Sequence, residues 1–534
     1  MTLIKSISGI RGTIGGPAGN GLTPLDTVKF ASAYGTWVKQ NSKKSKVKIV
    51  LGRDARISGP MIKSIVISTL QGLGIDVIDL GLSTTPSVEV AVVDLHADGG
   101  IILTASHNPK EYNGYKAYWN DGGQLVPPHD KNVIKEVEAI TSVDEVNWSG
   151  GEANITLIGP DMDEAYINMV KSLSVYPEVI QAQHDLSIVY TPIHGTGITL
   201  VPEVLSRFGF TNVHIVEAQA TPDGNFPTVG YPNPEESETM AMGLAMAKSL
   251  NADILLGTDP DADRVGIGVK NHKGEWVLMN GNQTAVLAFA YLIEARKAKG
   301  IAKPNDMVIS TIVTTAMINE VAKQNGVACY NVLTGFKWIA ELIKEKEANE
   351  NYVIGGEESF GLMIGNEIRD KDAVSAVALL CEMAAYEKAK GKSLFDKMIE
   401  LYMQYGFYYE QLISITKKGM NGQKEIAAMM EGFRTSPPAF IDGSEVVEML
   451  DYETQTGKKL ISGETWQLQL PKSNVLQFIT ADGSKISARP SGTEPKIKFY
   501  FSVHTTLASK EAYDHTFAGL DQKIQRIIKD MSLA

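Results

Sequence analysis

Short apolar segments alternate with segments of helical spacing through the first three quarters of this chain. Residues 46–54, 76–81 and 99–106 read as buried strands, with a helical segment between the first two. A second cycle of strands and helices runs through residues 186–259, and a third through residues 307–359. This alternation predicts largely parallel sheets that are covered by helices on both faces.

The last part of the chain has a different pattern. Strand-like segments at 408–416, 475–480, 485–489 and 497–503 follow one another with few helices between them, which predicts a smaller α+β domain. A chain of 534 residues exceeds what one hydrophobic core usually serves, so three or four domains are expected. The predicted domains are α/β at 1–165, 166–280 and 281–410, and α+β at 411–534.

Composition narrows the class of protein. The net charge of −12 argues against a nucleic-acid-binding surface, and any anion site in so acidic a chain needs locally concentrated basic residues. No stretch approaches the roughly 20 apolar residues of a membrane span, and the N-terminus lacks a secretory signal pattern. With only two cysteines, a disulfide framework is excluded. We therefore expect a cytoplasmic protein that has no nucleic-acid or membrane partner.

Three apolar strands run straight into polar, glycine-rich loops. Their sequences are IILTASHNP, ILLGTDPDADR and YVIGGEESFG. Ligands of open α/β sheets bind outside the carboxyl ends of the strands, where rigid strands carry the loops. These three loops are therefore the first places to look for a functional site.

The first loop carries Ser106, followed by a lysine-containing return. Pro109 and Gly114 bend the chain so that Lys116 can come back towards Ser106. A seryl oxygen needs a base or a metal to act as a nucleophile, and Lys116 could accept a proton if its pKa were lowered. Taken alone, the loop is better explained by a turn in which Ser, His and Asn side chains cap backbone groups. The G-x-S-x-G pattern of serine hydrolases is absent.

The second loop places three carboxylates at alternate positions. Asp259, Asp261 and Asp263 offer hard oxygen ligands that suit Mg²⁺, with a phosphate oxygen and water completing the shell. A calcium-binding EF-hand loop would need glycine and glutamate where Arg264 and Lys270 stand. The remaining alternative is a solvated acidic turn, in which the three charges would repel one another without a cation.

Two further loops provide groups for a sugar and for a second anion. Glu357 and Ser359 in GEESFG could orient vicinal hydroxyl groups, and residues 334–337 (TGFK) end another strand. Residues 489–498 (RPSGTEPKIK) combine a guanidinium, two hydroxyls, a glycine and two lysines, which is a plausible cradle for a phosphate. Gly391-Lys392-Ser393 does not complete the Walker A motif of nucleotide-binding proteins, because Tyr386 stands where the first glycine of the motif must be.

Together the loops offer a nucleophile, a metal site and two anion sites. Phosphoryl transfer needs this inventory, because its transition state requires in-line positioning and charge neutralisation. One phosphate would lie at Ser106 and the other at residues 489–498. A substrate phosphorylated at both ends is therefore expected.

These motifs resemble those of the α-D-phosphohexomutase family. TASHNPKEYNGYK resembles its phosphoserine loop, DPDADR its metal loop, GEESFG its sugar-recognition loop and RPSGTEPKIK its distal phosphate loop, in the family's order along essentially the full chain. The resemblance implies three α/β/α domains with mixed, mostly parallel sheets plus a C-terminal α+β domain around a central cleft. It also implies interconversion of hexose 1- and 6-phosphates through a phosphoserine enzyme and a hexose 1,6-bisphosphate.

The resemblance also implies roles for single residues. Ser106 would carry the phosphoryl group, and with Asp259, Asp261 and Asp263 it would hold one Mg²⁺ per chain. Lys116, Arg11 and His107 would be catalytic. The residues expected to bind the sugar or its phosphates are Arg264, Thr334, Gly335, Lys337, Glu357, Ser359, Lys371, Arg489, Ser491, Gly492, Thr493 and Lys498.

One position departs from part of the family. In the phosphomannomutase/phosphoglucomutase branch the sugar loop is closer to GEMSGH, whereas Gly361 occupies the place of that histidine here. The loop is closer to the phosphoglucomutase branches, which favours glucose phosphate over mannose or pentose phosphates and leaves N-acetylglucosamine phosphate least favoured. Alternatives in other classes are a metal-dependent phosphohydrolase and a silent sugar-phosphate sensor. We expect a monomer or a dimer.

Overall fold

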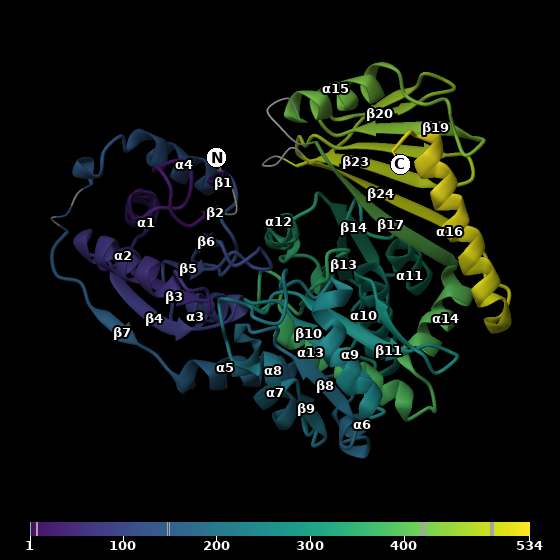
Figure 1. The fold of residues 1–534 in the computed structure, drawn as a ribbon, viewed down its shortest axis with the longest axis horizontal. Coiled ribbons are helices and arrows are strands. Elements are labelled where there is room, and N and C mark those ends of the chain that lie inside the picture. Colours follow the sequence, from purple (N-terminus) through teal and green to yellow (C-terminus); the bar gives the residue numbers. More distant parts are fainter. Residues whose placement is uncertain are drawn as a thin grey trace. The chain divides into compact units, whose positions relative to one another are not determined.

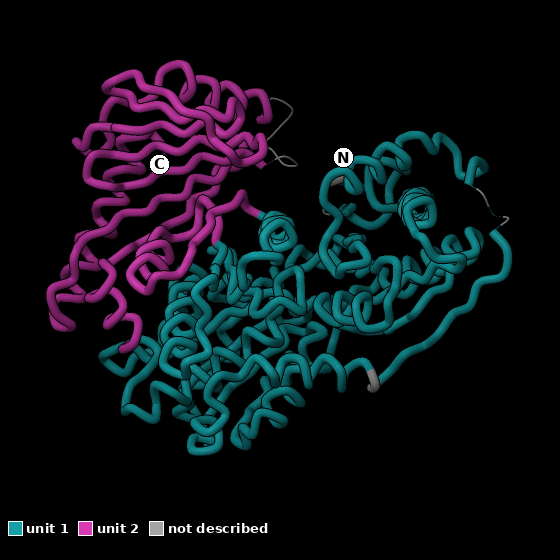
Figure 2. Tube along the Cα trace, turned by 180° about the vertical axis from the view of Figure 1, so that it is seen from behind, with its two compact units in different colours: residues 1–309, 335–395 teal, residues 310–334, 396–534 magenta. Residues whose placement is uncertain are grey.

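The computed structural model describes residues 2–6, 9–146, 148, 150–417, 422–491 and 496–533, and Figure 1 labels its elements. The chain divides into two compact units (Figure 2). The first comprises residues 1–309 and 335–395, and the second comprises residues 310–334 and 396–534. The four domains expected from the sequence stay a prediction.

A seven-stranded sheet in the order β1-β2-β6-β5-β3-β4-β7 organises the N-terminal part of the first unit. β5, β3, β4 and β7 are parallel, while β6, β2 and β1 extend the sheet in antiparallel pairs. The strands are β1 (Ile4–Ser6), β2 (Gly9–Thr13), β3 (Lys48–Arg53), β4 (Asp76–Leu82), β5 (Gly99–Leu103), β6 (Tyr112–Tyr118) and β7 (Ile155–Leu157). The helices are α1 (Pro24–Asn41), α2 (Gly59–Gly72), α3 (Thr85–Asp94) and α4 (His129–Ala139).

Local sequence explains how α1 begins and what it covers. Pro24 occupies its first turn, and Thr23 and Asp26 form a capping box that satisfies exposed N–H groups. Phe30 and Tyr34 of α1 are buried in one hydrophobic core with residues of β3 and α2. Burial of this apolar face holds the helix against the sheet.

Glycines in the strands allow α3 to lie close to the sheet. A Cβ atom at Gly52 would lie 2.7 Å from Cγ2 of Val88, and one at Gly100 would lie 2.6 Å from Cγ2 of Val92. Any larger residue would push α3 outwards. The close approach matters because α3 begins at Thr85, which contacts the metal loop.

The second sheet of the first unit has the order β12-β11-β10-β8-β9. Its centre is parallel, and β11 and β12 extend one edge in antiparallel pairs. Its strands are β8 (Ile188–Thr191), β9 (Val213–Ile215), β10 (Ile254–Thr258), β11 (Val265–Lys270) and β12 (Trp276–Met279). The associated helices are α5 (Pro160–Ser172), α6 (Pro177–Ala182), α7 (Val201–Phe208), α8 (Glu217–Ala220) and α9 (Ser237–Ser249).

The third sheet has the order β14-β13-β15-β16. The boundary between the two units falls within β13, between Ile309 and Ser310. β13 and β15 are parallel, and β16 is antiparallel to β15. The strands are β13 (Asp306–Thr311), β14 (Ala328–Val332), β15 (Asn351–Glu357) and β16 (Gly361–Ile364). The helices are α10 (Gly281–Ala298), α11 (Met317–Asn325), α12 (Phe336–Lys346) and α13 (Ala373–Lys388).

The second unit is built on an antiparallel sheet in the order β17-β24-β23-β22-β19-β20-β21, with β18 paired to β19. α15 (Gly422–Thr435) and α16 (Tyr513–Asp530) pack on β24 (Figure 1). The strands are β17 (Phe407–Thr416), β18 (Phe440–Ile441), β19 (Ser444–Asp451), β20 (Thr456–Lys459), β21 (Thr465–Gln467), β22 (Leu476–Thr480), β23 (Lys485–Pro490) and β24 (Lys496–Thr505). α14 (Leu394–Tyr405) precedes β17.

The predicted fold class is confirmed. Three mixed α/β sheets precede a C-terminal sheet of antiparallel strands. β10 ends at Thr258, just before the metal loop, and β15 ends at Glu357, within the sugar loop. Both strands therefore end where the polar residues begin in the sequence. Among the helices that the structure describes, none combines the length and apolar character of a membrane crossing.

Candidate active site

Ser106 lies in the turn between β5 and β6. Its φ of +49° is in the left-handed region, and its side chain is buried. The Oγ of Ser106 donates a hydrogen bond to Oδ2 of Asp259 at 2.8 Å and lies 3.2 Å from Nδ1 of His107. Its N–H donates to Oγ1 of Thr104 at 2.8 Å. The turn therefore directs the hydroxyl of Ser106 at the first residue of the aspartate loop.

Asp259, Asp261 and Asp263 occupy the loop between β10 and β11 and are fully buried. One carboxylate oxygen from each lies within 4.8 Å of the other two. The N–H groups of Asp263 and Arg264 donate to Oδ1 of Asp259 at 3.0 Å. Oδ1 of Asp261 and Oδ1 of Asp263 have no hydrogen-bond partner among the described residues. Buried hard oxygens with free lone pairs fit a divalent cation, so this cluster could hold a metal ion.

The charges in this cluster are unevenly balanced. Burial raises the pKa of Asp259 well above its ordinary value, and the charges of Asp263 and Asp261 add to the shift. Burial also acts to raise the pKa of Asp263, but Lys116, Lys371 and Arg264 outweigh it and lower that pKa. One of the three carboxyl groups thus resists ionisation beside ionised neighbours, which is a condition that a bound cation relieves.

Lys116, on β6, forms ion pairs with two of the three aspartates. Its Nζ lies 2.7 Å from Oδ2 of Asp261 and 2.8 Å from Oδ2 of Asp263. Burial acts to lower the pKa of Lys116, but the charges of Asp261, Asp263 and Asp370 together outweigh it, so the pKa is above its ordinary value. In this arrangement Lys116 keeps its proton. Lys116 could act as a proton acceptor, as expected, only if these aspartates paired with another cation and no longer raised its pKa.

Lys371 brings a second ammonium group to the cluster. Its Nζ lies 3.3 Å from Oδ2 of Asp263 and 2.9 Å from Oδ1 of Asp370. A Cβ atom at Gly361 would lie only 2.5 Å from Cδ of Lys371. The stem of Lys371 therefore fills the space that a histidine at position 361 would need, which gives a physical reason for the glycine there.

Two arginines reach the same loops. Arg11, on β2, donates from Nη1 to Oδ1 of Asn108 at 3.1 Å, and burial lowers the pKa of its guanidinium. Arg264 donates from Nη1 to Oε1 of Glu235 at 2.7 Å and to the carbonyl oxygen of Ser359 at 2.8 Å. Arg264 thus links the metal loop to the sugar loop.

The sugar loop between β15 and β16 meets the start of α12. Oε1 of Glu357 accepts a hydrogen bond from the N–H of Gly335, and Oγ of Ser359 donates to Oε2 of Glu357 at 3.2 Å. Lys337, in the first turn of α12, has a buried side chain. Its Nζ lies 4.5 Å from the ring centre of Trp338 and has no hydrogen-bond partner in the described part of the chain. Burial lowers its pKa. The contact predicted between Lys337 and a substrate stays a prediction.

The distal phosphate loop belongs to the second unit. Arg489 on β23 faces Lys498 on β24 in register, and its Nη1 donates to the hydroxyl of Tyr500 at 3.5 Å. The N–H of Ser491 donates to the carbonyl oxygen of Lys496 at 2.7 Å. Gly492 and Thr493 lie outside the described residues, and Thr334 is the last residue of the segment 310–334 of this unit. The roles of these residues stay predictions.

Sequence models of a known family match most of the chain. Phosphoglucomutase/phosphomannomutase alpha/beta/alpha domain I matches residues 3–144, domain II residues 164–274, and domain III residues 280–405. The chain belongs to the phosphoglucomutase/phosphomannomutase family. The resemblance to the α-D-phosphohexomutases is thereby confirmed.

Individual relatives support the same placement. Phosphoglucomutases from Staphylococcus aureus strains MRSA252 and N315 are 34% and 33% identical over 500 residues, which cover 93% of this chain and 88% of theirs. A phosphoglucomutase/phosphomannomutase family protein from Burkholderia thailandensis has the same fold, with a TM-score of 0.69 at 20% identity over 99% of this chain and 98% of that one. The phosphoglucomutase parafusin from Paramecium gives a TM-score of 0.69 at 18% identity over 99% and 95%. Mutases of this family are isomerases, so the predicted enzyme class is confirmed.

Sequence reasoning missed several residues of the candidate site. Thr85 donates from Oγ1 to Oδ2 of Asp261 at 2.9 Å, and its N–H donates to the carbonyl oxygen of the same residue at 2.9 Å. Arg56 forms a fully buried ion pair with Asp54 beneath the Ser106 turn. Both contacts come from polar segments that follow strands, DAR after β3 and STTP after β4. The strand-to-loop signal that identified the other loops was therefore present at these two as well.

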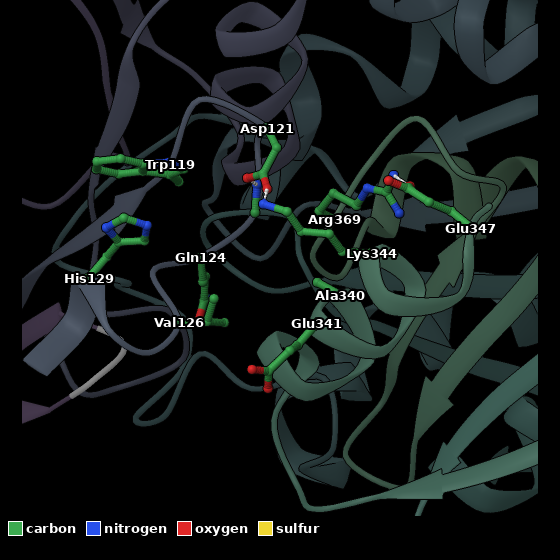
Figure 3. A pocket seen from close by; sticks show the side chains of 11 residues that line it. Trp119, Asp121, Gln124, Val126, His129, Ala340, Glu341, Lys344, Glu347 and Arg369 are labelled. Atoms are coloured by element: carbon green, nitrogen blue, oxygen red, sulfur yellow. Dashed lines mark hydrogen bonds and ion pairs between the residues drawn. The ribbon is translucent and has the colours of Figure 1, made fainter. Parts of the chain in front are cut away.

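A cavity of about 80 Å³ in the first unit lies apart from the predicted site residues, none of which lines it (Figure 3). Trp119 stacks on His129 along one wall, and two ion pairs, Asp121 with Lys344 and Arg369 with Glu347, border it. Its opposite charges are already paired with each other. The cavity therefore does not present the excess positive charge that a phosphate site needs.

Proposed function

We propose that this mutase interconverts hexose 1-phosphate and hexose 6-phosphate, with glucose phosphate as the favoured substrate, through a phosphorylated Ser106. The observation that carries the proposal is the 2.8 Å hydrogen bond from Oγ of Ser106 to Asp259 within three buried carboxylates. A phosphoryl group on Oγ of Ser106 would therefore lie beside a cation that the three carboxylates hold. The identity to curated phosphoglucomutases supports glucose phosphate.

Mg²⁺ is the proposed cofactor, because the described oxygens suit a hard cation. The carboxylates of Asp259, Asp261 and Asp263, with an oxygen on Ser106, would hold it. When bound, the ion would supply charge neutralisation for the transferring phosphoryl group. Oδ1 of Asp261 and Oδ1 of Asp263, which have no hydrogen-bond partner among the described residues, support this assignment independently of the family.

Cationic side chains would stabilise the charge that develops on the phosphoryl oxygens. Lys116 and Lys371 both pair with Asp263, so each is held close to the carboxylate cluster. Arg11 is held at the Ser106 loop through Asn108. Fixed positive charges in a buried site stabilise such a transition state without reorganisation. We propose that Lys371 supplies a cationic group close to the place that the histidine of the phosphomannomutase/phosphoglucomutase branch would occupy at position 361.

The sugar and its second phosphate would be bound by groups away from Ser106. Glu357 and Ser359 offer an acceptor and a hydroxyl suited to the sugar hydroxyls. Arg489, Ser491 and Lys498 are the proposed ligands of the second phosphate. A hexose 1,6-bisphosphate would then be both the intermediate and the activator, since either of its phosphates can return to Ser106.

The test is phosphorylation and turnover in matched variants. The purified protein should carry a phosphoryl group on Ser106, detected by intact mass and peptide mapping. Ser106→Ala should lose that mass and at least about 10³-fold of the mutase rate, since no oxygen remains to carry the group. Ser64→Ala, at an exposed position on α2, is the control and should behave as wild type.

Substrate comparison completes the test. Rates with glucose, mannose, ribose and N-acetylglucosamine 1-phosphates, each with Mg²⁺ and its bisphosphate, should be highest with glucose 1-phosphate. Full activity of Ser106→Ala would reject the mechanism. Release of inorganic phosphate without glucose 6-phosphate would identify a phosphohydrolase instead.

A further inference from the structure

Arg56 is the largest side chain that the first unit buries completely. Only 1% of its surface is exposed, and its Nε lies 3.2 Å from Oδ2 of Asp54, which is also fully buried. Burying an ion pair is costly unless the remaining donors are satisfied. The hydrogen-bond partners of the guanidinium N–H groups therefore indicate the role of Arg56.

Every N–H group of the guanidinium of Arg56 has a partner, and four of the five partners are backbone carbonyl oxygens of one loop. Nη2 donates to the carbonyl oxygens of Ser106 and Asn108 at 2.7 and 2.6 Å. Nη1 donates to those of Pro109 and Tyr112 at 2.8 and 2.7 Å. A planar guanidinium with five donors spans four carbonyls in a way that no other side chain can.

Asp54 continues the same network to the N–H of Ser106. Its Oδ2 accepts from Oγ1 of Thr104 at 2.7 Å as well as from Arg56, and Oγ1 of Thr104 in turn accepts the N–H of Ser106 at 2.8 Å. The N–H and the carbonyl oxygen of Ser106 are therefore both held by this network. This matters because Ser106 has a φ of +49°, which a non-glycine residue adopts only when its surroundings enforce it.

Another part of the first unit lies against a further side of Arg56. The ring centre of Phe226 lies 5.3 Å from Cζ of Arg56. A Cβ atom at Gly224 would lie 2.6 Å from Cα of Arg56. The guanidinium is therefore enclosed on this side by the 224–226 segment, while its N–H groups hold the serine loop.

We propose that Arg56 is a positioning residue for phosphoryl transfer. It holds residues 106–112 in the one conformation that keeps Oγ of Ser106 on the aspartate cluster, and it does not contact the sugar phosphate. This inference rests on the proposed phosphoserine function and deepens it. Loss of the four carbonyl contacts lowers the rate of transfer in both directions and leaves sugar binding nearly intact, because misplacing a nucleophile by about 1 Å is enough to cost about 10²-fold.

Arg56→Lys is the test variant, because it keeps the positive charge and removes the fork that spans four carbonyls. It should lower kcat roughly ten- to hundred-fold while KM changes less than about threefold. Amide hydrogen exchange in residues 106–112 should accelerate, with exchange in α1 unchanged. Arg207→Lys is the matched control, because Arg207 is an exposed arginine that pairs with Glu164 and Glu203.

Thr104→Val provides a second test that does not depend on how the buried lysine is tolerated. It removes only the hydroxyl that joins Asp54 to the N–H of Ser106, so it should show the same pattern of lower kcat and faster exchange in the loop, to a smaller extent. A folded Arg56→Lys protein with wild-type kcat overturns the proposal, as does faster exchange without loss of rate. If the wild type itself does not isomerise sugar phosphates, the proposed function fails, whereas a silent Arg56→Lys beside an active wild type rejects only this inference.

Discussion

The loops that follow β5, β10 and β15 each contain one non-glycine residue in a backbone conformation that side chains rarely adopt. Ser106 has a φ of +49°, Ala262, between the second and third aspartates, has a φ of +53°, and Phe360 in the sugar loop has a φ of +65°. Such strain persists only where surrounding contacts determine the conformation. At Ser106 those contacts come from Thr104 and Arg56, and at the metal loop the N–H of Ala262 donates to the carbonyl oxygen of Asp259 at 2.9 Å. Hydrogen bonds that hold the two loops thus set the positions of Oγ of Ser106 and of the carboxylates.

Binding of Mg²⁺ to the three aspartates should be measurable as an increase in the thermal stability of the protein. Because a ligand that binds only the folded state stabilises it, millimolar Mg²⁺ should raise the Tm by about 2 to 5 °C. Asp261→Asn removes one charged ligand and should abolish most of this increase. Asp94→Asn, at an exposed position on α3, should keep it. An equal increase in Asp261→Asn, measured by calorimetry with and without Mg²⁺, would show that the ion binds elsewhere.

At the scale of single elements, α3 connects sheet packing to the metal loop. The helix lies close to the sheet over Gly52 and Gly100, and its first residue, Thr85, makes two hydrogen bonds to Asp261. The N-terminus of the helix also carries partial positive charge. A shift of α3 away from the sheet would therefore move a partner of the aspartate loop.

Gly52→Ala tests this coupling. The new Cβ would meet Oγ of Ser83 and Cγ2 of Val88, so we expect overpacking to lower the free energy of unfolding by about 1 to 3 kcal/mol. We also expect a higher Kd for Mg²⁺, measured by calorimetric titration. Gly432→Ala is the control: this exposed glycine in α15 has open space around its Cβ, and alanine should stabilise the helix by about 0.5 to 1 kcal/mol. A Kd for Mg²⁺ unchanged in Gly52→Ala would refute the coupling.

At the scale of the whole molecule, the two compact units have cores of their own. In the second unit, Phe478 on β22 and Phe499 and Phe501 on β24 are fully buried, and Phe433 of α15 contacts the rings of the first two. The proposed phosphoserine and metal sites lie entirely in the first unit. Destabilising the second unit should therefore leave the chemistry at Ser106 intact.

Phe499→Ala is the variant that tests this separation. A fully buried phenylalanine replaced by alanine should cost about 3 to 5 kcal/mol, and hydrogen exchange should locate that loss in the described residues of the second unit, 310–334, 396–417, 422–491 and 496–533. The fraction of Ser106 that carries phosphate should stay at the wild-type value. Phe517→Ala, at a partly exposed position on α16, should cost less. Equal destabilisation of β5 and β10 would show that the units unfold as one.

What the sequence determined by itself was local. Strand and helix periodicity identified the α/β alternation, and the residue types at strand ends identified Ser106, the three aspartates and the sugar loop, because side-chain chemistry and hydrophobic pattern are properties of short segments. The proximity of Ser106 to Asp259 followed only as an expectation, since 153 positions separate them.

Tertiary structure decided the rest, because burial and charge pairing depend on residues far apart in the chain. It raised the pKa of Lys116, buried Lys337, and brought Lys371 into the space over Gly361. It also brought the guanidinium of Arg56 beneath the Ser106 loop. An arginine in a polar segment after a strand is indistinguishable in sequence from a solvated one, and only folding leaves its five donors with the carbonyl oxygens and the carboxylate that give it a role.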